Sequence, residues 1–442
     1  MSVPEAATAT VHRPRRALAT VVAVVFVDLL GFGVVIPILP FYVRSFGVSD
    51  VYIGLLAASY SLLQFAFAPL LGRLSDDRGR RPVLMLSLAG SATAWLVFGV
   101  SAEVQSAFGL VAGLATLFGS RMLAGAMGGN IATAQAYIAD VTPPERRAGA
   151  LGLVGAAFSL GFIFGPALGG LLASPAVVSA ARAVLPAVVP TTSYSLPSFG
   201  AACLSFTSLL LAATFVEEPD RSARAPTPRT TLVGAFLDAL RDVDLRGLVV
   251  AFFLVSVAFS GIQVMFIPYA ADVYGYAETQ TALLLTYVGV LGVVNQGVLV
   301  GRLSRRYDQT RLAVVGAVVL LAVLAVLPFA PAVGRAVLPV LPGPAWLTRE
   351  LVVLLVVLGG LSFGNGLLNV SLSTLVSQAT SADRQGNAFG VTQGAGSLGR
   401  TVGPPVMAIF YVLVYWLPFV AGALLLVPIP FVLRAARAVT SE

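Results

Sequence analysis

Long apolar runs recur along the whole of this 442-residue chain and constrain its fold more than any other feature. A helix needs about 20 mostly apolar residues to cross the ~30 Å hydrocarbon core of a bilayer. Twelve such runs can be read, at 18–43, 52–71, 83–100, 109–138, 148–173, 198–216, 247–272, 279–300, 312–333, 350–379, 386–411 and 413–434. They predict an all-α membrane protein with twelve transmembrane helices.

The composition excludes several classes of protein. Charged residues make up 11% of the chain, whereas a soluble domain carries about 25%. The mean hydropathy is +0.91 and 57% of residues are hydrophobic. A surface facing water on all sides cannot be built from this chain, which argues against a disordered protein, a nucleic-acid-binding domain and an ordinary cytosolic enzyme. The lipid bilayer is the expected partner, and binding to nucleic acid is not expected.

The arginines predict the orientation. All 27 basic residues are arginine, and 21 of them lie in segments that face the cytoplasm if the N-terminus is inside. The outer connections then hold four, namely Arg44, Arg182, Arg335 and Arg349. Cytoplasmic loops carry the excess of positive charge in membrane proteins. Both termini are therefore predicted to be cytoplasmic.

A polar connection at 217–246 divides the apolar runs into six and six. Its second part, 232–242, is expected to form a short helix on the membrane surface, and 174–197 is a long outer loop. The predicted organisation is a cytoplasmic tail (1–17), a six-helix bundle (18–216), a cytoplasmic linker (217–246), a second six-helix bundle (247–434) and a cytoplasmic tail (435–442).

The two halves contain related motifs. GRLSDDRGRR at 72–81 corresponds to GRLSRRYD at 301–308, and GFIFGPALGG at 161–170 to GRTVGPP at 399–405. The offsets are 229 and 238 residues, and the Ile-Pro pairs at 36–37 and 267–268 give 231. Such similar offsets favour duplication of a six-helix unit. Two pseudo-symmetric bundles bracketing a midplane cavity form the architecture of many secondary transporters.

At these motifs the sequence resembles the major facilitator superfamily, and within it the twelve-span drug/proton antiporters that include tetracycline efflux pumps. The motifs are FVDLLGFGVVIPILPFY (26–42), GRLSDDRGRR (72–81), RMLAG (121–125), YIADVTPPERRA (137–148) and GFIFGPALGG (161–170). The resemblance implies the major facilitator fold, transport of small molecules and protons, no cofactor, a functional monomer and a prokaryotic inner membrane.

The sequence departs from the tetracycline pumps at three places. Those pumps typically carry an acid in the third span, where this chain has Thr93–Ala94–Trp95. They often carry a histidine in the eighth span, where this chain has none. The second copy of the loop motif has Arg305 where an acid is expected. These differences argue against tetracycline itself as the substrate.

Residues 72–81, here called the latch segment, combine glycines, acids and arginines: Gly72, Asp76, Gly79, Arg80 and Arg81. A carboxylate near a helix N-terminus and opposite arginines is stabilised by both. In the family the acid of this segment locks the two bundles in the outward-facing state. Asp76 is the candidate for that role, with Asp77 a weaker one. The alternative is a loop that merely sets topology.

Asp28 is the most informative single residue. It lies ten residues into the first span, about 15 Å deep at 1.5 Å per residue. An ionisable group at that depth is a functional candidate. Arg121, in the middle of the fourth span, is the expected partner, in direct contact or through water. Family precedent links this arginine to proton coupling. The alternative for Asp28 is a structural ion pair.

Arg400 is a second deep cation, on one helix face with Gln393 and Ser397. It is expected to bind an anionic substrate, to contact backbone carbonyls or to reach Asp28. Aromatic and polar residues in the spans suit an amphipathic ligand, although each one singly is more often a packing residue. The expected cavity residues are Phe32, Tyr60, Gln64, Phe158, Phe162, Gln263, Phe266, Asn295, Asn365, Asn369, Gln393 and Arg400.

The fifth span carries the Gly-Pro motif that is typical of antiporters: Gly161, Gly165, Pro166, Gly169 and Gly170. Its glycines permit close helix packing, and the proline can bend the helix. The alternative is ordinary glycine and proline usage in a membrane helix.

The predicted function is a proton-coupled antiporter that exports small amphipathic or hydrophobic compounds by alternating access. The alternative is a symporter or uniporter for a metabolite, sugar or lipid. An enzyme is not expected: His12 lies in a polar tail, and the single cysteine, Cys203, excludes a thiolate metal cluster. No metal is expected.

Overall fold

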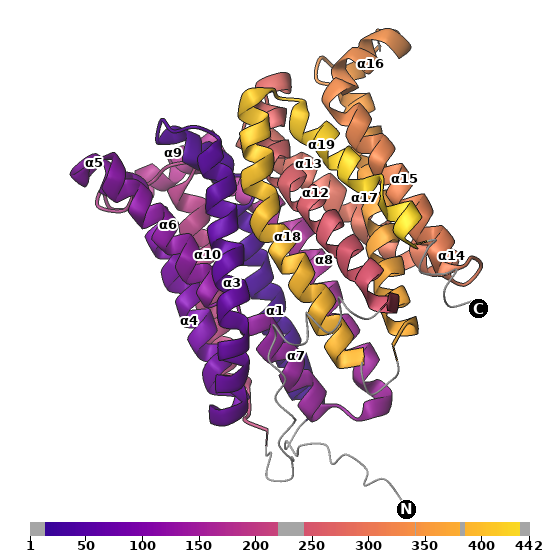
Figure 1. Cartoon of the computed structure of the whole chain (residues 1–442). Helices are drawn as coiled ribbons and strands as arrows, with labels where there is room; N and C mark the ends of the chain where they lie inside the picture. Colours follow the sequence, from indigo (N-terminus) through magenta and orange to yellow (C-terminus); the bar gives the residue numbers. More distant parts are fainter. Residues whose placement is uncertain (1–13, 220–242, 341, 381–384, 434–442) are drawn as a thin grey trace, which may run out of the picture. The chain divides into compact units, whose positions relative to one another are not determined.

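The computed structural model describes residues 14–219, 243–340, 342–380 and 385–433, and within these ranges the regular elements are helices (Figure 1). The all-α fold is thereby confirmed. The expected surface helix at 232–242 and the C-terminal tail lie outside the described residues, as do residues 1–13 of the N-terminal tail.

The helices of the first half follow in chain order. They are α1 (Pro14–Val35), α2 (Leu39–Ser45), α3 (Val51–Arg78), α4 (Arg80–Gly99), α5 (Ser101–Phe108), α6 (Leu110–Ala126), α7 (Asn130–Val141), α8 (Pro144–Ala173), α9 (Pro175–Val184) and α10 (Ser195–Phe215).

The second half continues with α12 (Val243–Tyr274), α13 (Glu278–Val294), a π-helix (Asn295–Val300), α14 (Gly301–Ser304), α15 (Gln309–Val326), a 3₁₀ turn (Leu327–Phe329), α16 (Ala330–Val337), α17 (Arg349–Gln378), α18 (Gln385–Leu413) and α19 (Leu417–Leu426).

Ten helical runs among the described residues are long and apolar enough to cross a membrane. The two remaining predicted spans are also helical. The eleventh is α18, which is 29 residues long but rich in glycine and polar residues. The twelfth is the shorter apolar run Leu417–Leu433. Every predicted span therefore coincides with helix.

Several spans differ from the simple rods that hydropathy predicts. The first is interrupted at 36–38, where Pro37 and then Pro40 near the start of α2 remove backbone donors. The fourth is interrupted at 127–129, which contains two glycines. In the other direction, α3 continues past Gly72 to Arg78, so most of the latch segment is helical and Gly72 does not end the helix.

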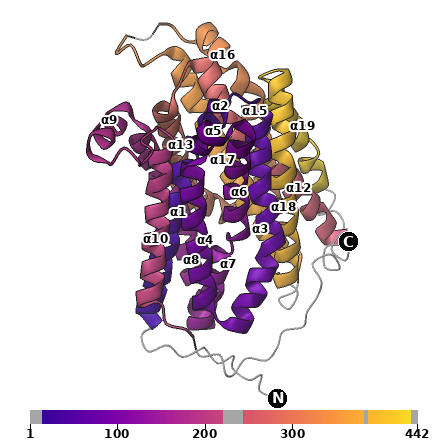
Figure 2. The same ribbon diagram turned by 90° about the vertical axis from the view of Figure 1, so that its left-hand side faces the viewer.

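Two compact units make up the chain. One contains residues 1–46, 62–228 and 277–286, and the other contains 47–61, 229–276 and 287–442. In the first unit α1 packs between α8 and α10, and α10 also lies beside α4 (Figures 1 and 2). In the second unit α12 packs on α18, and α15 on α17.

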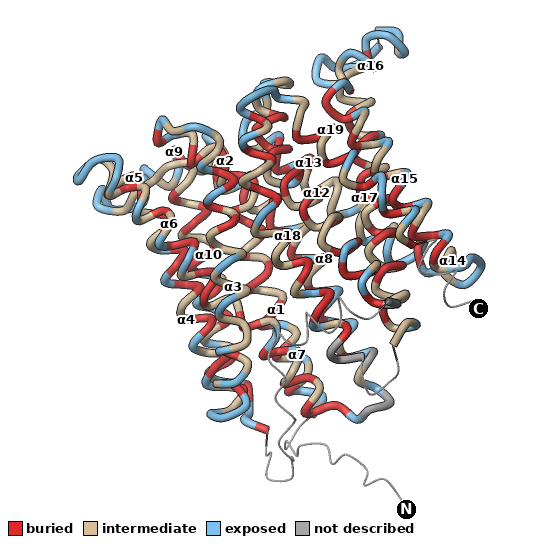
Figure 3. Tube along the Cα trace, in the orientation of Figure 1, coloured by how far each residue is buried: buried red, intermediate tan, exposed pale blue. Residues whose placement is uncertain are grey.

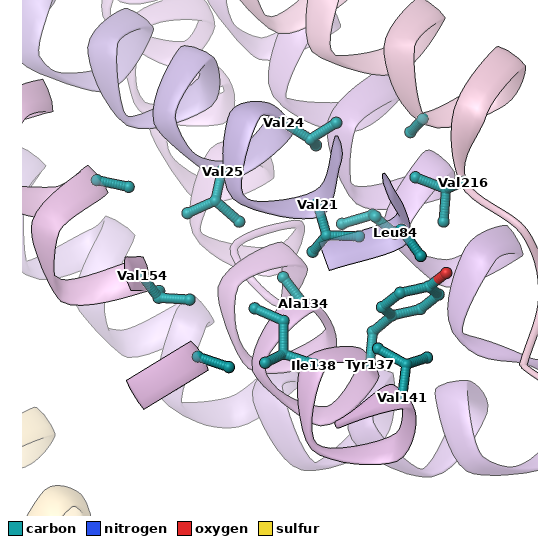
Figure 4. Close-up of a cluster of buried hydrophobic side chains, with 14 of the residues drawn as sticks. Val21, Val24, Val25, Leu84, Ala134, Tyr137, Ile138, Val141, Val154 and Val216 are labelled. Carbon is teal, nitrogen blue, oxygen red and sulfur yellow. The ribbon is translucent and has the colours of Figure 1, made fainter. Parts of the chain in front are cut away.

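The first unit is built around one apolar cluster. Val21, Val25, Leu84, Tyr137 and Ile138 are at most 3% exposed and bring together α1, α4 and α7 (Figure 4). Buried residues alternate with exposed ones along most helices, as the colours of Figure 3 show. This cluster fixes α7 against α1, which positions the site described below.

Glycines allow α1 and α8 to pack with their backbones in direct contact. A β-carbon at Gly33 would lie 2.7 Å from the carbonyl oxygen of Gly161 and 2.9 Å from the Cα of Gly165. In the second unit, a β-carbon at Gly399 of α18 would similarly lie 2.8 Å from the carbonyl oxygen of Phe253 in α12. The Gly-Pro motifs of the two halves thus make equivalent helix contacts.

Candidate functional site

The carboxylate of Asp28 lies inside the first unit, fourteen residues after the start of α1 and 9% exposed. Asn130, the first residue of α7, donates a hydrogen bond from Nδ2 to Asp28 Oδ2. Ser205 of α10 donates from Oγ to Asp28 Oδ1 at 3.2 Å. Three helices therefore meet at this carboxylate.

The amide of Asn130 is held in the orientation that suits Asp28. Its Oδ1 accepts a hydrogen bond from the backbone N–H of Ile131 at 2.9 Å, which leaves Nδ2 directed at the carboxylate. The break in the fourth span places Asn130 at the start of a new helix, where this local bond is available.

The partners of Asp28 are neutral. Among the described residues, no arginine forms an ion pair with this carboxylate. Within the described part of the chain, Asp28 therefore forms neither the expected ion pair with Arg121 nor a structural ion pair with another arginine. Communication through water remains a prediction.

Arg121 of α6 instead lies against aromatic rings. Its guanidinium carbon is 5.2 Å from the ring centroid of Trp95 and 5.9 Å from that of Phe32, and the residue is 5% exposed. Phe162 of α8 packs on Phe32 at 6.3 Å between centroids. A cation over ring faces is stabilised by about 0.5–2 kcal/mol. Phe32 follows Asp28 by one turn, so acid and aromatic surface share one side of α1.

The latch segment is organised around Arg80. Its Nε donates to Asp140 Oδ2 at 2.9 Å, and its Nη1 lies 2.7 Å from Asp76 Oδ1 and 3.0 Å from Ser75 Oγ. The side chains of Arg80 and Asp140 are 8% and 2% exposed, whereas that of Asp76 is 64% exposed. The buried partner of the arginine is therefore Asp140, at the end of α7, which the sequence did not single out.

The carboxylate at the start of α4 is Glu218, which corrects the expectation that Asp76 is the acid stabilised by a helix N-terminus. Glu218 accepts hydrogen bonds from the backbone N–H groups of Arg80 and Arg81, each at 2.7 Å. Gly79, at φ = 110°, makes the turn that exposes these donors. Asp76 lies instead in the last turn of α3.

Two further contacts hold the last turn of α10 and the segment after it at this place. Arg81 donates from Nη2 to the carbonyl oxygen of Ala213. The hydroxyl of Tyr137, which Figure 4 shows directed towards Val216, donates to the carbonyl oxygen of Glu217 at 2.8 Å.

The expected cavity residues of the first unit fall into two groups. Phe32 and Phe162 lie together beside Arg121, as described. Phe158 packs against the apolar cluster, and Gln64 lies beside Gly128 at the break of the fourth span. These last two have packing contacts.

In the second unit, Asn369 donates from Nδ2 to Asn365 Oδ1 at 2.8 Å, so the polar stripe of α17 is a local chain of hydrogen bonds. Asn295, in the π-helix, donates to Ser362 at 3.4 Å. Phe266 is buried and packs on Tyr269. The side chains of Gln263 and Gln393 belong to exposed residues, and Tyr60 is half-buried.

Arg400 lies in the middle of α18. Its Nη2 donates to Ser397 Oγ at 2.8 Å, on the preceding turn. Among the described residues no carboxylate forms an ion pair with it.

The sequence is similar to a known family of proteins over most of its length. A family model described as Major Facilitator Superfamily matches residues 21–404. The chain belongs to the major facilitator superfamily. Proteins of this superfamily are multi-pass transporters that bind small-molecule substrates and work in a lipid bilayer.

Relatives span almost the whole of this major facilitator protein. The class C tetracycline resistance protein of Escherichia coli is 28% identical over 436 residues, covering 96% of this chain and 98% of that protein. Human solute carrier family 67 member A1 is 30% identical over 385 residues, covering 85% and 81%. The crystal structure of the human organic anion transporter MFSD10 has a TM-score of 0.65 at 24% identity, covering 95% and 99%. The structural likeness shows the fold.

Proposed function

We propose that this chain is a proton-coupled antiporter that exports small amphipathic or hydrophobic organic compounds from a prokaryotic cell by alternating access. The observation that carries the proposal is Asp28, a carboxylate buried in α1 and held by neutral donors. Protonation of such a group breaks no ion pair. A carboxylate in an ion pair would instead leave its partner charge buried when it took up a proton.

The two donors suit both protonation states. The hydroxyl of Ser205 donates to the carboxylate and, after rotation, accepts from the carboxylic acid, since a hydroxyl does both. Asn130 Nδ2 keeps its bond to the other oxygen. We propose that Asp28 carries the proton and that Arg121, which lies over the ring of Phe32 one helical turn from Asp28, senses the charge.

The aromatic surface supports an amphipathic substrate. Phe32, Trp95 and Phe162 present rings next to one cation, and sites of this kind bind organic molecules through apolar contact with a few polar groups. The Escherichia coli relative that is matched over 98% of its length is named a tetracycline resistance protein, and this supports export of a toxic compound. Trp95, in place of the acid expected in the third span, supports a substrate other than tetracycline.

Purified protein in proteoliposomes tests this function. A panel of amphipathic drugs is first screened by susceptibility of an efflux-deficient strain, and the drug that the chain exports is then used as substrate. Export coupled to acidification of the side from which the drug leaves is expected, because protons move inwards. Asp28→Asn should abolish this acidification. The matched control is Asp308→Asn, the same chemical change at an exposed carboxylate outside the latch segment.

Two results would contradict the assignment. Full proton-driven export by Asp28→Asn would remove Asp28 from the coupling step. Uptake of substrate together with protons would replace the antiporter with the alternative, a symporter for a metabolite, sugar or lipid.

We also propose that the latch segment stabilises the outward-facing state. The support is the buried Arg80–Asp140 pair together with Asp76, which ties the end of α3 to the end of α7. One pair of cysteines that can be cross-linked only in the outward-facing state would be introduced into wild type and into Asp76→Asn. The cross-linked fraction of each protein would then measure the population of that state. An unchanged population would leave Asp76 as a topology residue.

The orientation is tested with the same chain. Cys203 is exposed, and Cys203→Ser provides a background without cysteine. In that background Ser179→Cys should react with an impermeant maleimide added outside, whereas Tyr307→Cys should react only after permeabilisation. The reverse pattern would place both termini outside.

A further inference from the structure

Arg400 stands at the centre of its helix, fifteen residues after Gln385 and thirteen before Leu413. At 1.5 Å per residue this is about 20 Å from either end of α18. A guanidinium remains charged in any protein environment. A charge at this depth is costly unless it has a counter-charge, and no described carboxylate provides one.

The guanidinium of Arg400 is held in place by a hydrogen bond, but this bond occupies only part of its donor capacity. Ser397 accepts from Nη2 and so fixes the plane of the group. Arg400 is half-buried, and among the described residues its guanidinium donates to Ser397, so further N–H groups remain available to a ligand. A held guanidinium with accessible N–H groups matches a planar carboxylate.

A second donor converges on the same space. The point where a β-carbon of Gly396 would stand is 3.5 Å from Arg400 Nη1 and 3.2 Å from Ser256 Oγ of α12. A guanidinium and a hydroxyl therefore both flank Gly396, and a side chain at this position would crowd the two donors.

We infer that Arg400, Ser256 and the space over Gly396 form a subsite for the carboxylate of an amphipathic organic anion. This inference rests on the proposed function, because it names the class of substrate that the transporter selects. The guanidinium supplies the counter-charge, Ser397 orients it, and the absence of a side chain at Gly396 admits the ligand oxygen. A neutral ester of the same molecule satisfies neither the charge nor the paired donors.

Matched acids and esters test the subsite. Rhodamine B, fluorescein and naphthaleneacetic acid, each with its alkyl ester, are titrated onto the purified full-length protein in nanodiscs without a proton gradient. Empty nanodiscs correct for partition into lipid. At least one acid is expected to bind about tenfold or more tightly than its ester, the order of one charge-assisted hydrogen bond.

Three variants separate the charge from the space. Arg400→Gln should remove the preference for the acid while the ester binds as in wild type, which also shows that the variant is folded. Arg400→Lys should keep a smaller preference, because it retains the charge without the planar fork. Gly396→Ala should weaken binding of the acid, because the new methyl group crowds the two donors. Gly390→Ala lies on the same helix with nothing within 4 Å, so it should leave binding of the acid unchanged.

The outcomes are decisive in either direction. Binding of none of the acids, equal binding of acid and ester, or an unchanged preference in both Arg400→Gln and Gly396→Ala would overturn the subsite. Proton antiport is measured separately with Asp28→Asn, so a preference for the acid without coupled proton movement would refute the antiporter and leave the subsite standing.

Discussion

Glu218 and Arg80 are joined by a hydrogen bond of 2.7 Å from the backbone N–H of Arg80 to Glu218 Oε1, across 138 residues of sequence. The same carboxylate accepts from Arg81. The first N–H groups of a helix lack partners within the helix. The segment that follows the sixth span therefore supplies the N-terminal cap of the third.

Replacement of Glu218 should destabilise the start of α4. Glu218→Ala removes both acceptors and the favourable charge at the helix N-terminus, so we expect a loss of about 1–2 kcal/mol. Glu218→Gln keeps one acceptor oxygen and should lose less. The difference in unfolding temperature is measured in detergent by heating each protein and quantifying the folded fraction by size-exclusion chromatography. Equal stability of Glu218→Ala and wild type would show that the cap is dispensable.

Asp140 should matter more for stability than Asp76. Removing one member of a buried ion pair leaves an uncompensated charge and costs about 3–5 kcal/mol, and Asp140 is 2% exposed. Exposed pairs contribute about 0–1 kcal/mol, and Asp76 is 64% exposed. Asp140→Asn should therefore lower the unfolding temperature in detergent far more than Asp76→Asn. The opposite order would contradict the assignment of Asp140 as the principal partner of Arg80.

The two donors to Asp28 should both affect proton-coupled transport. Asn130→Ala removes a hydrogen bond to a charged acceptor, which is worth about 1.5–3 kcal/mol, so transport is expected to slow roughly tenfold or more. Ser205→Ala should have a smaller effect because its bond to Asp28 is 3.2 Å long. Thr207→Ala, an exposed residue of the same helix, is the control. Rates are measured as proton flux per molecule of folded protein, and a normal rate in Asn130→Ala would exclude it from the site.

The α1–α8 contact should tolerate no side chain at Gly165. Its β-carbon would stand 2.6 Å from the Cα of Gly33, so Gly165→Leu must separate the helices. Overpacking of this kind costs about 1–3 kcal/mol or more. Gly155→Leu, on α8 where nothing lies within 4 Å, is the control. Yield and thermal stability in detergent are expected to fall in the first variant and to stay unchanged in the second.

The helices could be predicted from sequence because a bilayer imposes one length on all of them. The polar α18 was also recognised, because its Gly-Pro motif repeats that of α8. The break at 127–129 is not predicted by hydropathy, because residues 110–141 as a whole remain apolar enough for a single span.

At the candidate site, sequence identified the charge but not its partners. Asp28 stands out because an acid in an apolar run is rare. Asn130 and Ser205 lie 102 and 177 residues further on, and sequence spacing contains no information on which faces of distant helices meet. A signal for Asn130 was present in the Gly-Gly-Asn sequence that interrupts the fourth span. Glu218 gave no signal, because an acid in a charged linker is ordinary.

The cap formed by Glu218 has a consequence for biogenesis. Translation proceeds from the N-terminus, and domains form in that order. When α4 enters the membrane, the residue that completes its first turn has not been synthesised, and it appears 138 residues later. Until the sixth span has been inserted, the first N–H groups of the third can bond only to water or to residues already made. Closure of that turn needs no residue of the second half, so this part of the protein can mature while the ribosome is still at work.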